Sequence, residues 1–329
     1  MKALVTGATG FIGGNLVREL LAAGYGVRAM VRRNSDQRNL AGLDVEIAFG
    51  DLCDGPSLVA AMEGCQILFH VAASYTFWTP DPKLIYETNV GGTQRLLEAA
   101  KARGIEKVVY TSSESTIGIS KNGKLGTERL TAELSQLPGH YKRSKLLAEK
   151  VALSACKDGL PVVVVNPTVP VGPWDIKPTP TGQIVVDFLN GRMPAYVNTG
   201  LNVVDVQDVA WGHILAMEKG RAGERYILGN QNLTLREMLG VLGRIAGIEP
   251  PRLRIPLWAA MLAAYVSESA ARWLTRRPPR IPMAAVRAAA KFRHFDCSKA
   301  VRELGMPQTP IEQALGKAVR WFRENGYAC

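Results

Sequence analysis

Residues 3–13 read Ala-Leu-Val-Thr-Gly-Ala-Thr-Gly-Phe-Ile-Gly, and this stretch decides the fold. Its apolar start predicts a buried strand, and three evenly spaced glycines follow. In a strand-to-helix turn, Gly7 permits the tight turn, Gly10 lets a pyrophosphate approach the backbone, and Gly13 lets the helix pack close to its strand. The helix N-terminus then faces the phosphates. The stretch therefore predicts a dinucleotide-binding turn at the carboxyl end of a strand.

Strand and helix patterns alternate through the first half of the chain. Strands are expected at 2–6, 26–32, 45–49, 67–71, 107–111 and 161–166, and helices at 11–24, 56–63, 82–103 and 140–158. Such alternation predicts an α/β fold: a Rossmann-type, doubly wound parallel sheet with helices on both faces.

The second expected strand ends at Arg32 and Arg33. An acid at this point binds the ribose 2′-hydroxyl of NAD, whereas arginine accommodates the 2′-phosphate of NADP. We therefore expect NADP(H) rather than NAD(H) as the cofactor. The alternative is that the two arginines belong to a solvated basic turn that does not contact the cofactor. Asp51 and Leu52 close the third strand and are expected beside the adenine. The small residues that end the fourth strand let a cofactor approach the backbone: Val71, Ala72 and Ala73.

The pattern changes in a proline-rich loop that begins at Pro167. After it we expect a helix at 182–191, extended pieces at 195–197 and 202–204, a helix at 206–218, a strand at 225–228, and helices at 234–247, 256–275, 282–291, 298–305 and 310–325. Residues 1–166 are expected to form an NADP-binding Rossmann domain, to which 205–229 returns. Residues 167–204 and 230–329 are expected to form a smaller, mostly helical substrate-binding lobe over the carboxyl edge of the sheet.

Hydroxyl side chains end the fifth expected strand, and a tyrosine and a lysine lie four residues apart farther along. Tyr141 and Lys145 share one face of a helix. Carbonyl reduction needs a proton donor and a second hydrogen bond to the oxygen. Tyr141 would donate the proton and Ser113 would orient and polarise the carbonyl. Lys145 would hold the nicotinamide ribose and lower the pKa of the phenol.

These motifs resemble the extended short-chain dehydrogenase/reductase superfamily over essentially the whole chain. The matching residues are Thr6-Gly7-x-x-Gly10-x-x-Gly13, Ser112-Ser113, Tyr141-x-x-x-Lys145 and Asn166-Pro167. The resemblance implies that Ser113, Tyr141 and Lys145 form the catalytic triad and that Asn89 is chiefly structural. It further implies cofactor contacts from Thr9, Phe11, Ile12, Thr111, Asn166, Pro167, Thr168 and Val169.

Within the superfamily, residues 27–33 resemble the dihydroflavonol-reductase-like branch. Longer runs are similar to the hopanoid-associated sugar epimerases: 139–145, 166–173, 175–182 and 223–229. That family is named from its genome context. The resemblance therefore implies a role in hopanoid biosynthesis but does not establish a particular reaction.

Two features favour net oxidation or reduction over nucleotide-sugar epimerisation or dehydration. NADP suits net reduction, whereas most epimerases recycle a bound NAD. Leu201 stands where nucleotide-sugar members carry an arginine that pairs with the diphosphate. A third alternative, a redox sensor that binds NADP without turnover, typically lacks the tyrosine that is intact here.

Aromatic residues in the expected substrate loops favour a hydrophobic, amphipathic or sugar-modified lipid substrate: Tyr75, Phe77, Trp78, Trp174, Phe188 and Tyr196. The same aromatics would also suit packing between the lobes. Glu114, directly after the serine pair, would either form an ion pair between the lobes or narrow the substrate site.

Composition is that of a globular protein, with 47% apolar and 21% charged residues in 329 and a mean hydropathy near zero. The five cysteines are scattered and form no Cys-x-x-Cys, so neither a disulfide framework nor a metal site is expected. With no signal peptide and no apolar run of spanning length, the chain is expected in the cytoplasm, as a monomer or homodimer.

The net charge of +11 implies attraction to anions. Residues 252–293 hold nine lysines or arginines and one acid, Glu268. This basic stretch is either a solvated face or an anion contact. Nucleic acid is not expected as a partner, because the chain has no zinc finger, RNA-binding aromatic signature or basic heptad.

Residues 256–266 are apolar nearly all round, and Arg272, Arg276, Arg277 and Arg280 follow them. The segment is too short to span a bilayer. It is expected either as a lid helix buried over the substrate site or as a weak peripheral contact with the inner face of a membrane.

Overall fold

A seven-stranded parallel sheet forms the centre of the larger lobe. The computed structural model describes residues 1–76, 78–79, 81–119, 124–271, 279 and 281–328. The strand order is β10-β6-β5-β4-β1-β2-β3, and every pair is parallel. The strands are β1 (Lys2–Thr6), β2 (Gly26–Val31), β3 (Glu46–Phe49), β4 (Ile67–His70), β5 (Lys107–Thr111), β6 (Val162–Pro167) and β10 (Arg225–Leu228). The predicted doubly wound fold is confirmed.

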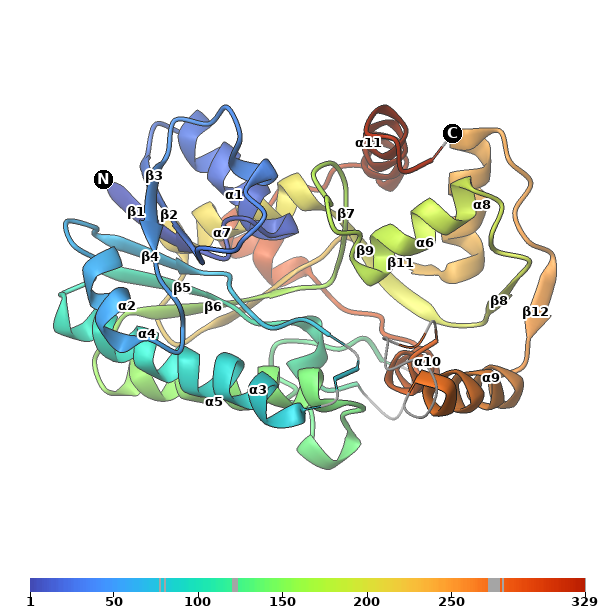
Figure 1. Ribbon diagram of the computed structural model, residues 1–329, viewed down its shortest axis with the longest axis horizontal. Helices are drawn as coiled ribbons and strands as arrows, with labels where there is room; N and C mark the ends of the chain where they lie inside the picture. Colours follow the sequence, from blue (N-terminus) through green and yellow to red (C-terminus); the bar gives the residue numbers. More distant parts are fainter. Residues whose placement is uncertain (77, 80, 120–123, 272–278, 280, 329) are drawn as a thin grey trace.

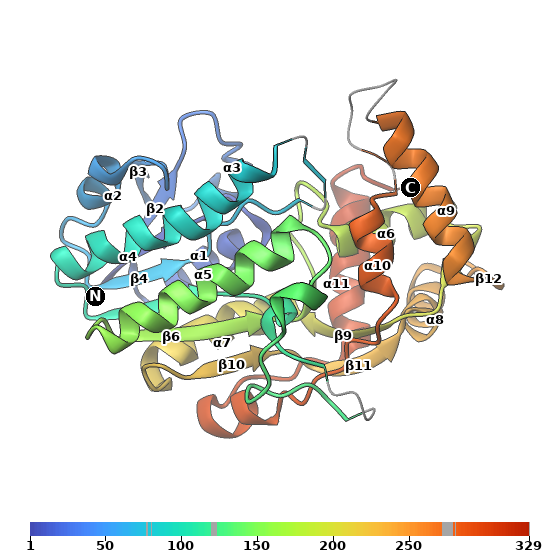
Figure 2. The same ribbon diagram turned by 90° about the horizontal axis from the view of Figure 1, so that it is seen from below.

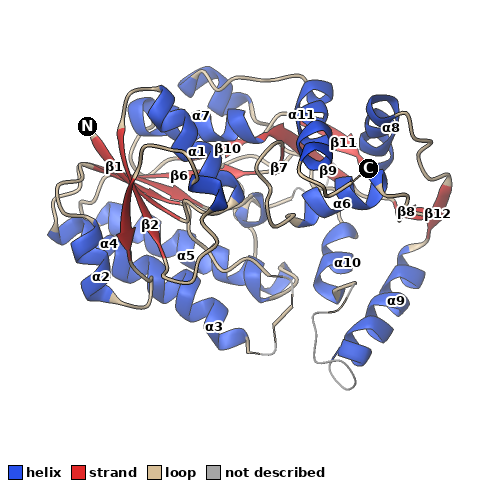
Figure 3. Ribbon diagram, turned by 45° about the horizontal axis from the view of Figure 1, so that its top comes forward, coloured by secondary structure: helices blue, strands red, loops and turns tan. Residues whose placement is uncertain are grey.

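Helices cover both faces of this sheet (Figure 3). One face packs against α1 (Phe11–Ala22) and α7 (Val206–Lys219), and the other against α2 (Gly55–Ala61), α4 (Gly92–Ala102) and α5 (His140–Lys157). The central strands read as unbroken apolar runs because they are buried on both faces. Since β10 pairs with β6, the segment that begins at α7 returns to the large sheet.

The smaller lobe lies beside the large sheet and faces the carboxyl ends of its strands (Figure 1). It contains the sheet β11-β9-β7 and the pair β12-β8. Its own core is built largely from three helices. The elements are β7 (Val169–Val171), α6 (Pro180–Leu189), β8 (Ala195–Val197), β9 (Gly200–Asp205), β11 (Gln231–Thr234), α8 (Leu235–Ala246), β12 (Leu253–Ile255) and α11 (Ile311–Glu324).

Two further helices, α9 (Leu257–Ala270) and α10 (Met283–Ala289), pack side by side at the rim of the smaller lobe (Figure 2). Only Ala260 and Ala264 of α9 are buried. None of the helices within the described ranges is both long enough and apolar enough to cross a bilayer.

The structure divides one predicted helix, 82–103, into three parts. These are α3 (Pro82–Tyr86), a π-helical turn at Glu87–Gly91, and α4. Strands β7, β11 and β12 were not predicted, because each is three or four residues long and lacks a clear apolar alternation.

Candidate active site

A cavity of about 1360 Å³ opens at the carboxyl ends of the parallel strands and continues into the smaller lobe. The strand order reverses beside β1, with β4 on one side and β2 on the other. Ligands of open α/β sheets bind at such a switch point. The volume exceeds that of an ordinary small-molecule pocket, so a dinucleotide and a second compound fit together.

The glycine turn can pack this closely against the neighbouring backbone only because it lacks side chains. Gly7 has φ +69°, and a Cβ there would lie 2.7 Å from the backbone nitrogen of Ala72. A Cβ on Gly13 would lie 2.1 Å from the carbonyl oxygen of Gly7. Gly10 is the N-cap of helix α1 and supplies no side-chain hydrogen bond to its first turn. Its first N–H groups are thus available to an anion, and the turn fits a pyrophosphate.

Most of the residues expected to contact the cofactor line this cavity. They are Gly7, Thr9, Gly10, Phe11, Ile12, Gly13, Arg32, Asp51, Leu52, Val71, Ala72, Ala73, Thr111, Tyr141, Lys145, Pro167, Thr168 and Val169. Two expected residues do not line it. The Arg33 guanidinium lies 5.1 Å from the centre of the Phe49 ring, and Asn166 is buried below the site.

Asp36 is an acid near the end of β2 that the sequence interpretation did not weigh. Its carboxylate is 2.7 Å from Arg38, which lowers its pKa to about 2. The Asp36 charge is therefore already paired. Arg32 forms no ion pair with any of the residues that the structure describes, and it lies on the same cavity wall.

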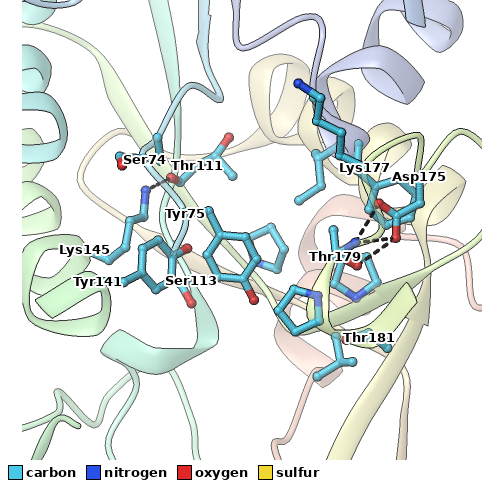
Figure 4. A pocket seen from close by; sticks show the side chains of 18 of the residues that line it. Ser74, Tyr75, Thr111, Ser113, Tyr141, Lys145, Asp175, Lys177, Thr179 and Thr181 are labelled. Atoms are coloured by element: carbon cyan, nitrogen blue, oxygen red, sulfur yellow. Dashed lines mark hydrogen bonds between the residues drawn. The ribbon is translucent and has the colours of Figure 1, made fainter. Parts of the chain in front are cut away.

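The fold brings Ser113, Tyr141 and Lys145 together although 28 residues separate the first two (Figure 4). Ser113 follows β5, and the other two lie on α5. The Ser113 side chain hydrogen-bonds the Tyr141 phenol. Ser113 Oγ accepts hydrogen bonds from the backbone N–H and the hydroxyl of Ser115, at 3.1 and 3.0 Å. Because these two bonds use both lone pairs of Ser113 Oγ, the hydroxyl group is left to act as a donor, to the Tyr141 oxygen or to a substrate oxygen.

The pKa values in this trio differ from the sequence-based prediction. Loss of hydration and the Glu114 charge raise the pKa of Tyr141 above its usual range. Lys145 is not among the groups that shift the pKa of Tyr141, and its ammonium donates to the Thr111 carbonyl oxygen at 2.6 Å. Burial lowers the pKa of Lys145 itself to about 7. Tyr141 consequently stays protonated at neutral pH, as a proton donor requires.

The buried side-chain amides of Asn89 and Asn166 hydrogen-bond the segments that carry Ser113, Tyr141 and Lys145. Asn89, in the π-helical turn, accepts a hydrogen bond from Ser74 N at 2.7 Å and donates to Ser144 Oγ at 2.9 Å. It thereby joins the loop after β4 to α5, in agreement with its expected structural role. Asn166 donates to the Ser113 carbonyl oxygen at 3.1 Å and to Glu149 at 2.8 Å.

Glu149 was missed by the sequence analysis, since nothing in its surroundings forms a motif. It lies eight residues after Tyr141 on α5 and is 2% exposed. Arg225 of β10 pairs with it at 3.0 Å. This buried ion pair ties the last strand of the sheet to the helix that carries Tyr141.

The expected substrate aromatics separate into two groups. Tyr75 and Tyr196 line the cavity, and the Tyr75 ring centre is 4.6 Å from that of Tyr141. Trp174 does not line it: its ring lies 3.6 Å from the Arg18 guanidinium and packs near Trp321. Trp78 also lies outside the lining, Phe188 is in the core of the smaller lobe, and Phe77 is outside the described residues.

Glu114 forms an ion pair with Arg293, which follows α10. Arg293 also donates to the Glu114 carbonyl oxygen at 2.7 Å. Both residues line the cavity. The two alternatives for Glu114 are therefore combined in one contact that joins the lobes at the wall of the site.

Several cavity residues were missed because no motif contains them. They include Lys142, Lys177 and Lys291. Among the residues that the structure describes, no cluster of His, Cys, Asp or Glu could hold a metal ion, and the four described cysteines are free.

Comparison with known proteins shows the family to which the chain is similar. The family model for the NAD dependent epimerase/dehydratase family matches residues 3–229. The chain is 49% identical to a putative dihydroflavonol 4-reductase of Synechocystis sp., over 98% of this chain and 95% of the relative. It is 39% identical to sterol demethylase protein B of Methylococcus capsulatus, over 99% of each.

Solved structures agree with this. The crystal structure of gox2253 is 43% identical, with TM-score 0.88 over 99% of both chains. The dTDP-glucose 4,6-dehydratase DesIV of Streptomyces venezuelae, solved with NAD and TYD bound, is 27% identical, with TM-score 0.80 over 100% of this chain and 99% of that chain.

Proposed function

Because the chain belongs to the NAD dependent epimerase/dehydratase family, in the reductase-like branch of the extended short-chain dehydrogenase/reductases, we propose that it is an NADP(H)-dependent oxidoreductase. It reduces a carbonyl group, or oxidises the corresponding alcohol, on a hydrophobic or sugar-modified lipid substrate, in hopanoid biosynthesis. The observation that carries the proposal is the Ser113–Tyr141 pair, which opens into the same cavity as the glycine turn.

Each residue of the trio has a distinct task. The nicotinamide cofactor, when bound, supplies or accepts the hydride. Ser113 donates its remaining hydrogen to the substrate oxygen and holds it beside Tyr141. Tyr141 transfers the phenolic proton to that oxygen during reduction. Lys145 is anchored on the Thr111 carbonyl group, from which its ammonium can reach a ribose hydroxyl in the adjoining cavity.

Preference for NADP is supported by the charges at the end of β2. Arg32 lines the cavity there, with Asn34 and Ser35 next to it. Asp36, the nearby acid, is paired with Arg38 and does not compete for Arg32. A guanidinium that forms a charge-assisted, bidentate contact with a phosphate suits the 2′-phosphate.

A hydrophobic substrate is supported by the wall that the smaller lobe supplies. Its apolar lining residues are Ile184, Met193, Val197, Leu201, Leu235, Ile281, Ala285, Val286, Ala288 and Ala289. Leu201 is among them, where an arginine would pair with a sugar diphosphate. The names of two relatives refer to a dihydroflavonol and a sterol. The alternative function, nucleotide-sugar epimerisation or dehydration, is favoured by the likeness to DesIV.

Weak peripheral membrane association belongs to the same proposal. Four large side chains on α9 are exposed: Trp258, Leu262, Tyr265 and Val266. No α9 residue lines the cavity, which supports the membrane alternative over a buried lid. Instead, α10 residues form that wall. The arginines at 272, 276, 277 and 280 lie outside the described residues.

The test is turnover of purified protein with NADPH and a panel of hydrophobic ketones, in parallel with UDP- and dTDP-hexoses. Net oxidation of NADPH with formation of an alcohol supports the proposal. Isomerisation or dehydration of a nucleotide sugar without net change in the cofactor would overturn it in favour of the alternative. NADPH binding without turnover on any compound would indicate a redox sensor. In the native host, compounds that accumulate with Tyr141→Phe would identify the substrate by mass spectrometry.

A further inference from the structure

Lys142, next to Tyr141 on α5, is a largely buried lysine with no carboxylate partner among the described residues. Its side chain lines the cavity, and the residue is only 6% exposed. Within the described part of the chain, its ammonium forms no hydrogen bond or ion pair with the protein, and it is open to the cavity rather than fully enclosed. A buried ammonium without compensation costs free energy. The missing counter-charge is therefore expected from whatever enters the cavity.

The charges around Lys142 are mostly positive. Burial is the main cause that lowers the pKa of Lys142, and the charges of Arg293 and Lys291 lower it as well, whereas the Glu114 charge raises it. Glu114 is already engaged, since both its carboxylate and its carbonyl group receive the Arg293 guanidinium. Lys142 and the more exposed Lys291 thus remain as spare positive charges at the substrate end of the cavity.

We propose that Lys142 binds a carboxylate of the substrate, so that the compound reduced or oxidised is an amphipathic keto or hydroxy acid. The inference rests on the proposed function and names the substrate class more closely. Lys142 and Tyr141 line the same cavity, and Lys142 lies within reach of the charges of Glu114, Arg293 and Lys291, so the carboxylate would be held at the substrate end of that cavity.

A monoanion fits this site better than a diphosphate does. A lysine ammonium is a single compact charge, whereas diphosphates are held best by bidentate guanidinium groups. Among the described residues, the guanidinium whose charge acts on Lys142 is that of Arg293, and it is occupied by Glu114. The apolar wall formed by α10 then accommodates the rest of an amphipathic acid.

Binding of decanoate and of its neutral analogue decanamide to the protein–NADPH complex tests the proposal by calorimetry, without need of turnover. Wild-type protein is expected to bind decanoate more tightly than decanamide. Lys142→Met should weaken decanoate binding by about 10- to 100-fold and leave decanamide binding unchanged, since a charge-assisted hydrogen bond is lost. Lys142→Arg should retain most of the preference.

The matched control is Lys150→Met, which removes an exposed lysine from the same helix. It should bind decanoate as the wild type does, and unchanged NADPH affinity in every variant shows that each is folded. Equal binding of decanoate to wild type and Lys142→Met, or no preference over decanamide in wild type, would overturn the carboxylate site. Loss of UDP binding on Lys142→Met, with decanoate unaffected, would overturn it in favour of a diphosphate. The oxidoreductase proposal is tested by ketone reduction and the carboxylate site by decanoate binding. Either proposal can therefore be overturned while the other stands.

Discussion

At the residue scale, the chemistry of Tyr141 depends on how the fold removes water from it. Desolvation and the nearby Glu114 charge keep the phenol protonated. Ser113 is held by Ser115 so that it can face the same oxygen. The pair is thus arranged to donate two hydrogen bonds to a carbonyl group.

Replacing Tyr141 by Phe removes the proton donor and keeps the ring packing against Tyr75. We expect kcat for ketone reduction to fall by about 100-fold or more, because general acid catalysis contributes on that order. NADPH affinity and thermal unfolding should stay close to wild type. Turnover within a few-fold of wild type would show that another group is the acid.

Replacing Arg32 by Asp should remove a charge-assisted contact with the 2′-phosphate and add repulsion. NADP affinity is expected to fall by about 10- to 100-fold, and NAD affinity much less. Fluorescence titration with both cofactors measures the ratio. Arg33→Asp is the control, since that guanidinium faces Phe49 rather than the cavity. An unchanged NADP/NAD ratio in Arg32→Asp would contradict the assignment.

The lowered pKa of Lys145, about 7, makes stability depend on pH in a definite direction. An unfolded lysine titrates near pH 10.4, so between about pH 7 and 10 the unfolded chain binds more protons than the folded chain. The free energy of unfolding of wild type relative to Lys145→Met should therefore rise with pH across this window. Urea denaturation of the cofactor-free protein at several pH values measures it. Lys150→Met should show no such trend, and a flat difference for Lys145→Met would refute the buried titration.

At the element scale, a departure from the predicted helices positions a residue that supports the active site. The apolar periodicity of 82–103 predicts one helix, yet a π-helical turn interrupts it at Glu87–Gly91. The turn aims Asn89 at both Ser74 and Ser144. Periodicity reports which face of a helix is apolar, and it does not report a local change in hydrogen bonding made for a contact far away in the chain.

Helix α9 carries the membrane prediction. Leu262→Glu places a charge in its exposed apolar face, and should abolish co-sedimentation with anionic vesicles at low salt. The control is Leu84→Glu, at an equally exposed leucine on α3. Wild type and the control should pellet more with anionic than with neutral vesicles. Equal recovery of wild type in the supernatant with both vesicle types would exclude membrane association.

At the scale of the whole molecule, two lobes share one site. The sequence predicts the large sheet, the glycine turn and the approach of Ser113 to Tyr141, because each follows from a short motif or from strand order. It offers an ion pair between the lobes for Glu114 without indicating Arg293 as the partner, and it does not predict the Glu149–Arg225 pair or the position of Lys142. These depend on residues far apart in the chain that meet only when the lobes pack. The sequence also does not decide the place of Trp174, because an aromatic ring is equally suited to lining a substrate pocket and to packing outside it.

An apolar groove of about 490 Å³ beside α9 shares one residue, Ile281, with the wall of the large cavity. A substrate dissolved in a bilayer would thus have an apolar path from the α9 surface toward Tyr141. The rate would then follow the mole fraction of substrate in the membrane rather than its amount per litre. Adding inert lipid at constant total substrate should lower the rate, the behaviour known as surface dilution.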